Sequence, residues 1–182
     1  MQKFFVLVAF LGLLALPLLA QDNPKLGVFA GYQYEHLGNF PSSGTDFNTN
    51  GWDAALNYFF SRHLGVTGDF SGVYTSVNGD TYSLYTYSGG PVFAFREGRF
   101  NPFAHVLFGG ASLCGCFSGS GSSTTINGFT LMMGGGVDAK FSQHFAIRLG
   151  QFDWVYYDFS HNGASKSFSD NVRFSTGVVA RF

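Results

Sequence analysis

Histidine is the residue type in this sequence most suited to acid–base or metal chemistry, because an imidazole changes its charge near neutral pH. The 182-residue chain carries five, at positions 36, 63, 105, 144 and 161. His105 stands among apolar residues of a predicted strand, where a Ser–His pair could act on a lipid. However, no serine or acid lies at a spacing that supports such a nucleophile. Motifs such as HExxH, a phosphate-binding glycine loop or an EF-hand loop are absent, so we expect no catalytic residues, no metal site and no cofactor.

Cys114 and Cys116, which flank Gly115, form the second group with distinctive chemistry. They lie in a Gly/Ser-rich stretch that we expect to be an outer loop, and an oxidising exterior favours a disulfide there. A bridge across one residue closes a small, strained ring, and strained bridges are easily reduced. Two thiolates are too few to hold a structural metal ion. The pair is therefore a candidate disulfide.

Charged side chains are few and stand at alternate positions of extended segments, which predicts that they share one face. On the inside of a closed barrel these charges would have to pair, because a buried charge without a partner is strongly destabilising. We expect a lumen network that is either a structural lattice or a gated path for protons or ions. Its expected members are Glu35, Asp53, Asp69, Asp138, Arg148, Asp153, Arg173 and Arg181.

The N-terminus has the composition of an export signal. Lys3 supplies a positive charge, residues 4–19 are almost wholly apolar, and the small residue Ala20 precedes a polar run. These are the parts of a secretory signal peptide, and Pro17 lies near the expected processing site. A retained transmembrane anchor is the alternative, but the apolar stretch is short for a hydrocarbon core of about 30 Å. We expect a signal peptide over residues 1–20 and one domain over 21–182.

The composition of the rest of the chain is unusual for a water-soluble protein. Aromatic residues make up 19% of the sequence and charged residues 12%, whereas soluble domains carry about 25% charged residues. No basic run suggests nucleic acid as a partner. No later stretch reaches the roughly 18 apolar residues of a helical span. Within lipid, every backbone polar group must form a hydrogen bond with another part of the protein. Without helical spans, a closed β-barrel is the remaining structure that satisfies this requirement.

Strict alternation of apolar and polar residues supports a barrel of eight strands. For example, Tyr32 and Tyr34 alternate with Gln33 and Glu35. The segments are long enough for tilted membrane strands, which need about 9–11 residues. Short turns alternate with longer outer loops, which places both termini on the periplasmic side. The expected strands cover residues 25–36, 51–60, 64–74, 81–95, 101–111, 126–140, 144–157 and 171–182.

A soluble, lipocalin-like barrel would show the same alternation with its faces reversed. The polar face here consists of small residues and a few compensating charges, which suits a narrow filled interior better than a surface in water. Aromatic residues near the strand ends predict two girdles at the membrane interfaces. The predicted girdles are Tyr32, Tyr34, Trp52, Tyr74, Trp154 and Tyr156 on the outer rim, and Tyr58, Phe60, Phe95, Phe103, Phe145 and Phe182 below.

The alternation breaks once, in the seventh expected strand. Continuing the period from Arg148 would point Gln151 and Asp153 at lipid, where a charge is costly. One extra residue returns both to the interior and turns Phe152 outward. We therefore predict a β-bulge near Gly150, since glycine accepts the backbone angles that a bulge can require.

The last eight residues, from Ser175 to Phe182, resemble the C-terminal signal that the barrel-assembly machinery reads, with Gly177 and the terminal Phe182 as its recognised positions. The chain as a whole resembles the OmpA-like and OmpX-like family of eight-stranded outer-membrane barrels. The resemblance implies an all-β, closed antiparallel eight-stranded up-and-down transmembrane barrel in the bacterial outer membrane. We expect no peptidoglycan-binding domain such as several OmpA relatives carry. The residues that carry the resemblance are Gly51-Trp52, Gly89-Gly90-Pro91, Asn101-Pro102-Phe103, 134–138, Ile147-Arg148-Leu149 and the last strand.

These observations predict a non-enzymatic barrel that contributes to envelope integrity. Its partners would be outer-membrane lipid and, during biogenesis, the assembly machinery. The alternatives are an outer-membrane lipid-modifying enzyme and, third, a narrow channel, although eight strands leave little room for a pore. Aromatic residues in the expected outer loops could serve adhesion or recognition. They are Phe40, Phe47, Phe117, Phe159 and Phe168.

Overall fold

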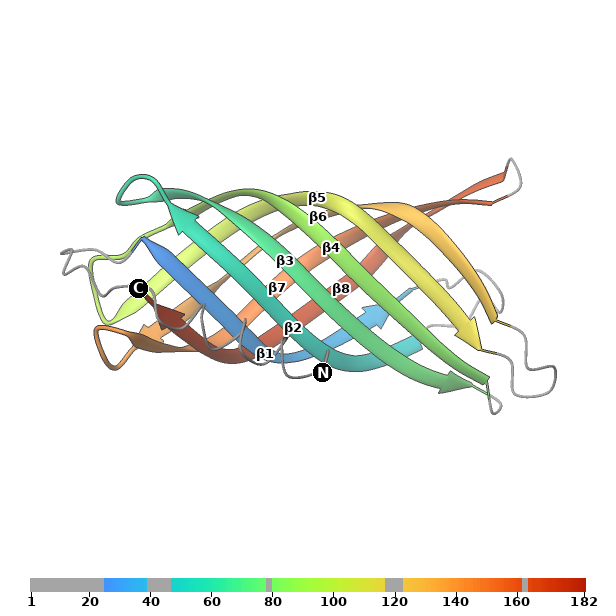
Figure 1. Ribbon diagram of the computed structural model, residues 1–182, viewed down its shortest axis with the longest axis horizontal. Helices are drawn as coiled ribbons and strands as arrows, with labels where there is room; N and C mark the ends of the chain where they lie inside the picture. Colours follow the sequence, from blue (N-terminus) through green and yellow to red (C-terminus); the bar gives the residue numbers. More distant parts are fainter. Residues whose placement is uncertain (1–24, 39–46, 78–79, 117–122, 162–163) are drawn as a thin grey trace, which may run out of the picture.

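The computed structural model is a closed barrel in which each strand pairs with its neighbours in the sequence and the first pairs with the last (Figure 1). The structure describes residues 25–38, 47–77, 80–116, 123–161 and 164–182. The predicted fold class is confirmed, while the expected signal peptide lies outside the described residues. The strands are β1 (Leu26–Leu37), β2 (Phe47–Phe59), β3 (Leu64–Val77), β4 (Asp80–Ala94), β5 (Phe100–Cys116), β6 (Ser123–Lys140), β7 (Phe145–His161) and β8 (Ala164–Arg181).

The two ends of the barrel differ. Three short turns, residues 60–63, 95–99 and 141–144, lie at one end together with the C-terminus, and we call this the turn end. The opposite end, here the loop end, carries the other connections. Within the described ranges, no helix is long and apolar enough to cross a membrane.

Strands near the loop end are longer than the sequence predicts. β5 continues to Cys116 and pairs there with Ser123, the first residue of β6. The ladder between β7 and β8 likewise continues to His161 and Ala164. The expected long loops at residues 112–125 and 158–170 are therefore largely strand. The sequence predicted that each strand stops where the alternating apolar residues stop. Outside the lipid, however, two strands can pair through their backbones without apolar side chains.

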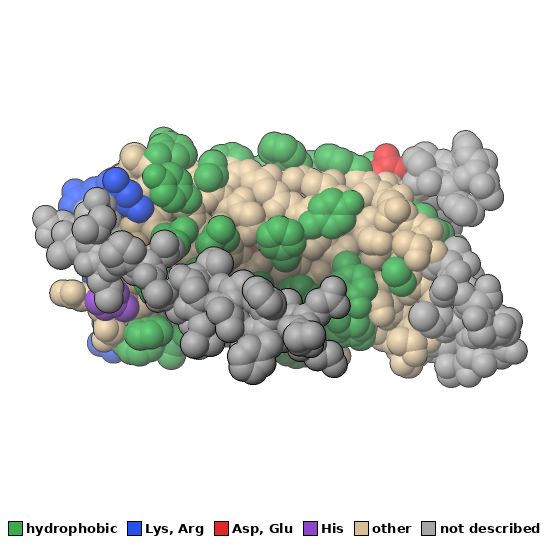
Figure 2. All heavy atoms as spheres, in the orientation of Figure 1, with side chains coloured by type: hydrophobic (Ala, Val, Ile, Leu, Met, Phe, Trp, Pro, Cys, Tyr) green, Lys and Arg blue, Asp and Glu red, His purple; other side chains and the backbone are tan. Residues whose placement is uncertain are grey.

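Alternation gives the barrel an apolar outer face, and Figure 2 shows green apolar side chains spread over its middle. Side chains such as Phe70 and Phe108 are more than half exposed, whereas the inward-facing Phe29 is fully buried. Exposed apolar surface on this scale is typical of a protein that meets lipid. Further exposed members of this face are Val28, Leu56, Val66, Val106, Met133, Ile147, Leu149, Phe152, Val172 and Val178.

The aromatic residues of the predicted girdles lie on the outer face with one exception. At the turn end, Phe103 points inwards, where its ring packs against the Arg148 guanidinium at 4.4 Å. The residues two positions before and after it on β5, Asn101 and His105, are buried, and Phe103 shares their face. The prediction for Phe103 was therefore wrong, because aromaticity alone does not decide the face of a strand.

The predicted bulge in β7 is confirmed. Val137 pairs with Gly150 while the next residue of β6 pairs with Arg148, so Leu149 has no partner of its own. The ladder with β8 shifts over the same stretch. As a result, Gln151 and Asp153 are 1% exposed and Phe152 is 62% exposed. A second shift, between Val155 and Tyr157, was not predicted.

The interior is layered along the barrel axis. Towards the loop end it is filled by apolar side chains, which we call the apolar plug. The middle is polar, and a smaller apolar group of Phe29, Ala55, Ala146 and Val179 lies nearer the turn end. The plug consists of Leu37, Val73, Leu84, Leu107, Ala111, Met132, Val155, Tyr157, Phe159 and Phe168.

Two of the aromatic residues assigned to outer loops belong to this plug. Phe159 and Phe168 are only 8% and 7% exposed, so their predicted exposure was wrong. Both stand on strands that continue past the membrane-spanning part, where alternation still points every second side chain inwards. Phe40, Phe117 and the side chain of Phe47 lie outside the described residues.

Candidate functional site: the lumen network

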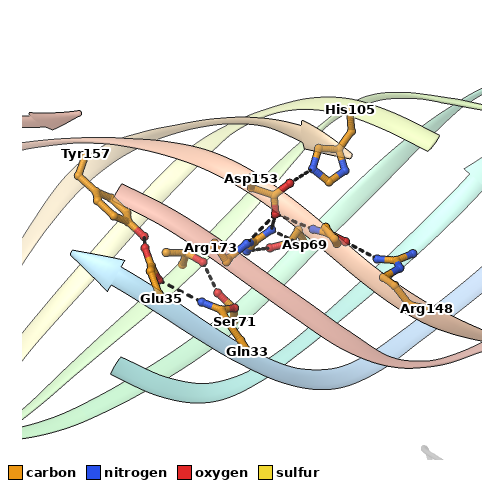
Figure 3. A network of polar contacts seen from close by, with 11 residues as sticks. Gln33, Glu35, Asp69, Ser71, His105, Arg148, Asp153, Tyr157 and Arg173 are labelled. Carbon is orange, nitrogen blue, oxygen red and sulfur yellow. Dashed lines mark hydrogen bonds and ion pairs between the residues drawn. The ribbon is translucent and has the colours of Figure 1, made fainter. Parts of the chain in front are cut away.

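The polar side chains of the interior meet at Arg173 of β8, which is 1% exposed (Figure 3). Its guanidinium donates to both carboxylate oxygens of Asp69 on β3, over 2.9 and 3.2 Å. It also donates to Asp153 Oδ2 on β7 over 2.8 Å. Bidentate arginine–carboxylate contacts are among the strongest charge-assisted hydrogen bonds. Arg173 therefore joins β8 to β3 across the lumen, past β1 and β2.

A chain of contacts continues from Asp153 towards the turn end (Figure 3). His105 Nε2 on β5 lies 2.7 Å from Asp153 Oδ1. Gln151 donates to Asp153 Oδ2 over 2.6 Å, and its own oxygen accepts from Arg148 Nη1 over 2.5 Å. The amide of Gln151 thus connects the carboxylate at the centre of the network with the next arginine.

Arg148 and Arg181 share one carboxylate near the turn end. Arg148 Nε donates to Asp138 Oδ1 over 2.9 Å, and Arg181 Nη2 donates to Asp138 Oδ2 over 3.1 Å. The Arg148 guanidinium also lies between two rings, 4.1 Å from the centroid of Phe29 and 4.4 Å from that of Phe103. Cation–π contacts of this kind hold a guanidinium in place without neutralising it.

Glu35 occupies the loop-end side of the network. Its carboxylate accepts from the Tyr157 hydroxyl over 2.6 Å and from Gln33 Nε2 over 3.0 Å. In the ladder that closes the barrel, Glu35 stands opposite Arg173. Tyr157 also belongs to the apolar plug, so this hydroxyl marks the boundary between the polar and apolar layers.

Asp53 differs from the other carboxylates. It is 1% exposed, and within the described residues neither of its oxygens has a hydrogen-bond partner. Its ladder neighbours are Gly31 on β1 and Ser71 on β3, whose hydroxyl bonds instead to Thr86 over 2.6 Å. Asp53 therefore adds a buried carboxyl group to the lumen without a hydrogen bond among the described side chains.

Glycines on the inner face make room for this network. A Cβ added at Gly134 would overlap Asp153 Oδ1 and the Phe152 carbonyl oxygen. One added at Gly177 would overlap the backbone of β1 at Ala30 and Gly31. Gly177 was predicted as part of an assembly signal, and close packing at the seam between β8 and β1 is a second reason for a glycine there.

The structure places all eight residues of the predicted lumen network inside the barrel, each at most 7% exposed. Seven of them take part in hydrogen bonds or ion pairs, and Asp53 does not. Sequence reasoning missed His105, Gln33 and Tyr157 as partners. Counting in twos from Asn101 on β5 would have placed His105 on the inner face, next to the charges.

His63 stands apart from the network, and the side chain of His161 lies outside the described residues. His63 lies in a turn, 3.7 Å from Glu97, and packs on Phe93 and Phe95. His105 itself is 7% exposed inside the barrel, so its ring does not meet lipid on the outer face. A lipid-directed Ser–His pair at that position therefore has no support from the geometry. The described His, Cys, Asp and Glu side chains form no group of three that could hold a metal ion.

The candidate disulfide is not formed at Cys114. Its thiol is free, with Sγ 3.4 Å from the Thr125 hydroxyl on β6. Both cysteines belong to β5, where residues two apart are separated by nearly 7 Å. This spacing is at the upper limit for a disulfide. The side chain of Cys116 lies outside the described residues.

Among the described residues, the contacts between charged side chains do not run the whole length of the lumen. They extend from the turn end to Glu35 and Tyr157. Beyond them lies the apolar plug, where the buried Asn171 bonds only to the backbone of Gly38, Val155 and Phe168. Chemically, the arrangement can hold strands together by paired charges. In the described part of the chain it provides no continuous polar path between the two ends.

Comparison with known proteins agrees with this architecture. The structure is similar to Neisserial surface protein A, with a TM-score of 0.64 and 14% identity over 89% of this chain and 100% of that one. It is similar to Ail, the attachment invasion locus protein of Yersinia pestis, solved with the heparin analogue sucrose octasulfate (TM-score 0.60, 20% identity, 88% and 99% covered). A third similar structure is outer membrane protein W of E. coli (TM-score 0.55, 14% identity, 89% and 100% covered).

No curated protein matches the sequence. These structural likenesses, at 20% identity or less, establish the fold. The family described as "Outer membrane protein beta-barrel domain" matches residues 6–182, which is nearly the whole chain. The short turns of such barrels face the periplasm, so the turn end is the periplasmic end and the loop end is extracellular. The protein therefore belongs to the outer membrane protein β-barrel family and resides in the bacterial outer membrane.

Proposed function

We propose that this protein is a non-enzymatic outer-membrane barrel that contributes to envelope integrity and presents an extracellular surface for adhesion or recognition. The observation that carries the first part is the closed interior. A network centred on Arg173 crosses the lumen, and the apolar plug fills the space beyond it. Such an interior favours a structural lattice over a proton or ion path.

The extracellular ends of the strands support the second part. Trp52, Tyr74 and Tyr85 form an aromatic rim on the outer face, with Trp52 Nε1 donating to the Tyr74 hydroxyl over 3.2 Å. Beyond the rim the outward-facing side chains are polar, so the hairpins project into water. The exposed polar side chains beyond the rim are Asn48, Asn50, Ser76, Thr81, Thr125, Asn127, Ser167 and Ser169.

The charge of this surface limits what it could recognise. The loop-end segments 38–50, 75–82, 112–127 and 158–170 contain a single Lys or Arg residue, Lys166. Sulfated polysaccharides bind chiefly through basic side chains. Although Ail was solved with a heparin analogue, we expect this surface to engage its partner through amide, hydroxyl and aromatic groups.

Deletion of the gene in the source bacterium tests the envelope role. We expect the deletion strain to become more sensitive to anionic detergent and to bulky antibiotics, and the wild-type gene to restore resistance. The acyl-chain pattern of lipid A should not change, since a change would indicate a lipid-modifying enzyme instead. An unaltered barrier in the deletion strain would refute the envelope role.

A further inference from the structure

The aromatic rim on β2, β3 and β4 lies at the extracellular edge of the lipid-facing surface, on neighbouring strands of the barrel wall (Figure 1). Its members Trp52, Tyr74 and Tyr85 are 43%, 42% and 38% exposed, so much of their ring surface remains accessible. The rings also contact one another. Besides the hydrogen bond from Trp52 to Tyr74, the rings of Tyr74 and Tyr85 meet edge to face, with their centroids 6.0 Å apart. These contacts fix the three side chains in one arrangement.

Glycines lie beneath the rings of this wall. Gly72 of β3 stands opposite both Trp52 and Tyr85, and a Cβ added to it would meet Trp52 Nε1 at 2.9 Å and two Tyr85 ring carbons at 3.0 Å. Gly110 of β5 stands opposite Tyr87, and a Cβ added there would overlap the Tyr87 hydroxyl and two of its ring carbons. The rings therefore lie across glycines of neighbouring strands. In this position they can present their faces to a neighbouring molecule.

Amide and hydroxyl groups border the aromatic rim on its extracellular side. Asn50 Oδ1 accepts from the Tyr32 hydroxyl, and Asn48 Oδ1 accepts from the Tyr34 hydroxyl over 2.9 Å. Among the described residues of β1 to β4, no outward-facing side chain beyond the rim carries a carboxylate, ammonium or guanidinium group. The remaining outward-facing side chains there are His36, Ser76, Thr81 and Ser83.

The wall formed by β5 to β8 differs in its described part. Near the loop end, its exposed aromatic side chains on β5 and β6 are Phe108 and Phe129, which have no polar group. On β7, Trp154 stacks on Tyr156. Anchoring at the interface requires amphipathic rings around a barrel but no concentration of them on one wall. The arrangement on β1 to β4 therefore indicates a more specific contact.

We propose that the aromatic rim binds the sugar headgroup of a glycolipid in the outer leaflet. The rim continues the lipid-facing surface at its extracellular end, which is the height of lipid headgroups. A pyranose ring has an apolar face of C–H groups that packs on aromatic rings, and hydroxyls at its edge that pair with amides. Ligand sites commonly combine aromatic walls with a few polar groups in this way. Because the described border carries no ionic group, a sugar suits it better than a phosphate.

Fluorescence of the two tryptophans tests the proposal. Trp154→Phe leaves Trp52 as the reporter of the rim, and Trp52→Phe leaves Trp154 as the reference on the other wall. Each protein is refolded into phosphatidylcholine vesicles that contain increasing fractions of digalactosyl diacylglycerol, an uncharged glycolipid. A parallel series contains phosphatidylglycerol, which is anionic and carries no sugar. We expect the emission of Trp52 to change saturably with the glycolipid only, and the emission of Trp154 to change little in either series.

Two further substitutions, made in the Trp154→Phe protein, locate the site. Tyr85→Leu should raise the half-saturating glycolipid fraction at least about fivefold because it removes one ring of the rim, whereas Phe129→Leu, which removes an exposed ring from β6, should change it less than about twofold. Heat modifiability verifies that each variant is folded. Absence of a glycolipid response, equal responses of Trp52 and Trp154, an equal response to phosphatidylglycerol, or equal effects of the two substitutions would overturn the proposal.

This glycolipid site rests on the recognition role proposed above, to which it assigns a partner within the membrane. The two tests remain distinguishable. A negative result in vesicles would overturn the glycolipid site alone, because the deletion strain tests the envelope role independently.

Discussion

Among individual residues, Arg173 has the most consequential contacts. It is buried and holds two carboxylates on two other strands, Asp69 and Asp153. Taking such charges out of water costs several kcal/mol per ion, which only close pairing repays. Arg173 therefore adds little net stability by itself. Its loss, however, would leave two buried acids without a positively charged partner.

Arg173→Ala should lower the free energy of unfolding by about 3–5 kcal/mol, because it leaves buried charges without a partner. The matched control is Arg62→Ala, whose partner Glu97 lies 3.3 Å away and whose pair is exposed. An exposed ion pair contributes at most about 1 kcal/mol. Urea-induced unfolding in lipid vesicles measures both, and equal effects would argue against a network that stabilises the lumen.

Gly134→Ala should also destabilise the barrel, by about 1–3 kcal/mol, which is typical of overpacking. The added methyl group would overlap Asp153 and the neighbouring backbone. Gly68→Ala is the control, because its methyl group would meet only Phe70, at 3.9 Å on the outer face. The same unfolding assay applies. If Gly134→Ala is as stable as Gly68→Ala, the inner face has more space than the structure indicates.

Among the elements, β7 shows how the backbone positions the network. Its bulge at Leu149 and Gly150 turns Gln151 and Asp153 inwards, where Asp153 meets Arg173. A bulge contributes one extra residue to its strand, so removing that residue restores regular alternation without reversing either face.

Deletion of Gly150 should therefore leave a barrel that folds, because Gln151 and Asp153 stay inside. Deletion of Gly68 in the regular ladders of β3 should prevent folding, since it reverses the faces of half a strand. Heat modifiability on gels, the shift of a folded barrel on boiling, reports the outcome. Two equally unfolded variants would show that the bulge itself is required.

The end of β8 carries a prediction about assembly. Phe182 closes the barrel through two backbone hydrogen bonds with Leu26, over 2.8 and 3.0 Å. If its aromatic ring is also the signal read during biogenesis, deletion of Phe182 should reduce the amount of barrel in the outer membrane and raise periplasmic aggregate. Fractionation followed by immunoblotting measures this. Normal outer-membrane levels would remove the support for an assembly signal.

Strand number, faces and the β7 bulge could be predicted because each follows from a local period of two. The same period identified the eight interior charges, since charges on the inner face interrupt small residues. The position of Phe103 and the partners of Arg173 could not be predicted in this way. They depend on the shear of the barrel, which sets residues from strands far apart in sequence at the same height. The strand extensions were missed because polar hairpins resemble loops in composition.

The barrel as a whole has three regions. Its outer face is apolar and meets lipid, its extracellular hairpins are polar, and its interior is closed by the lumen network and the apolar plug. Eight strands enclose a space that side chains can fill, and here they do. The barrel is therefore expected to stabilise the membrane and present a surface, and not to pass solutes.

Conductance in a planar lipid bilayer tests whether the lumen of the folded barrel is closed. Purified, refolded protein should insert without producing discrete current steps above the background, in salt of either neutral or acidic pH. Heat modifiability of the same protein sample, measured before it is added to the bilayer, verifies that the barrel is folded. Reproducible single-channel steps from folded protein would contradict a closed lumen and favour a channel instead.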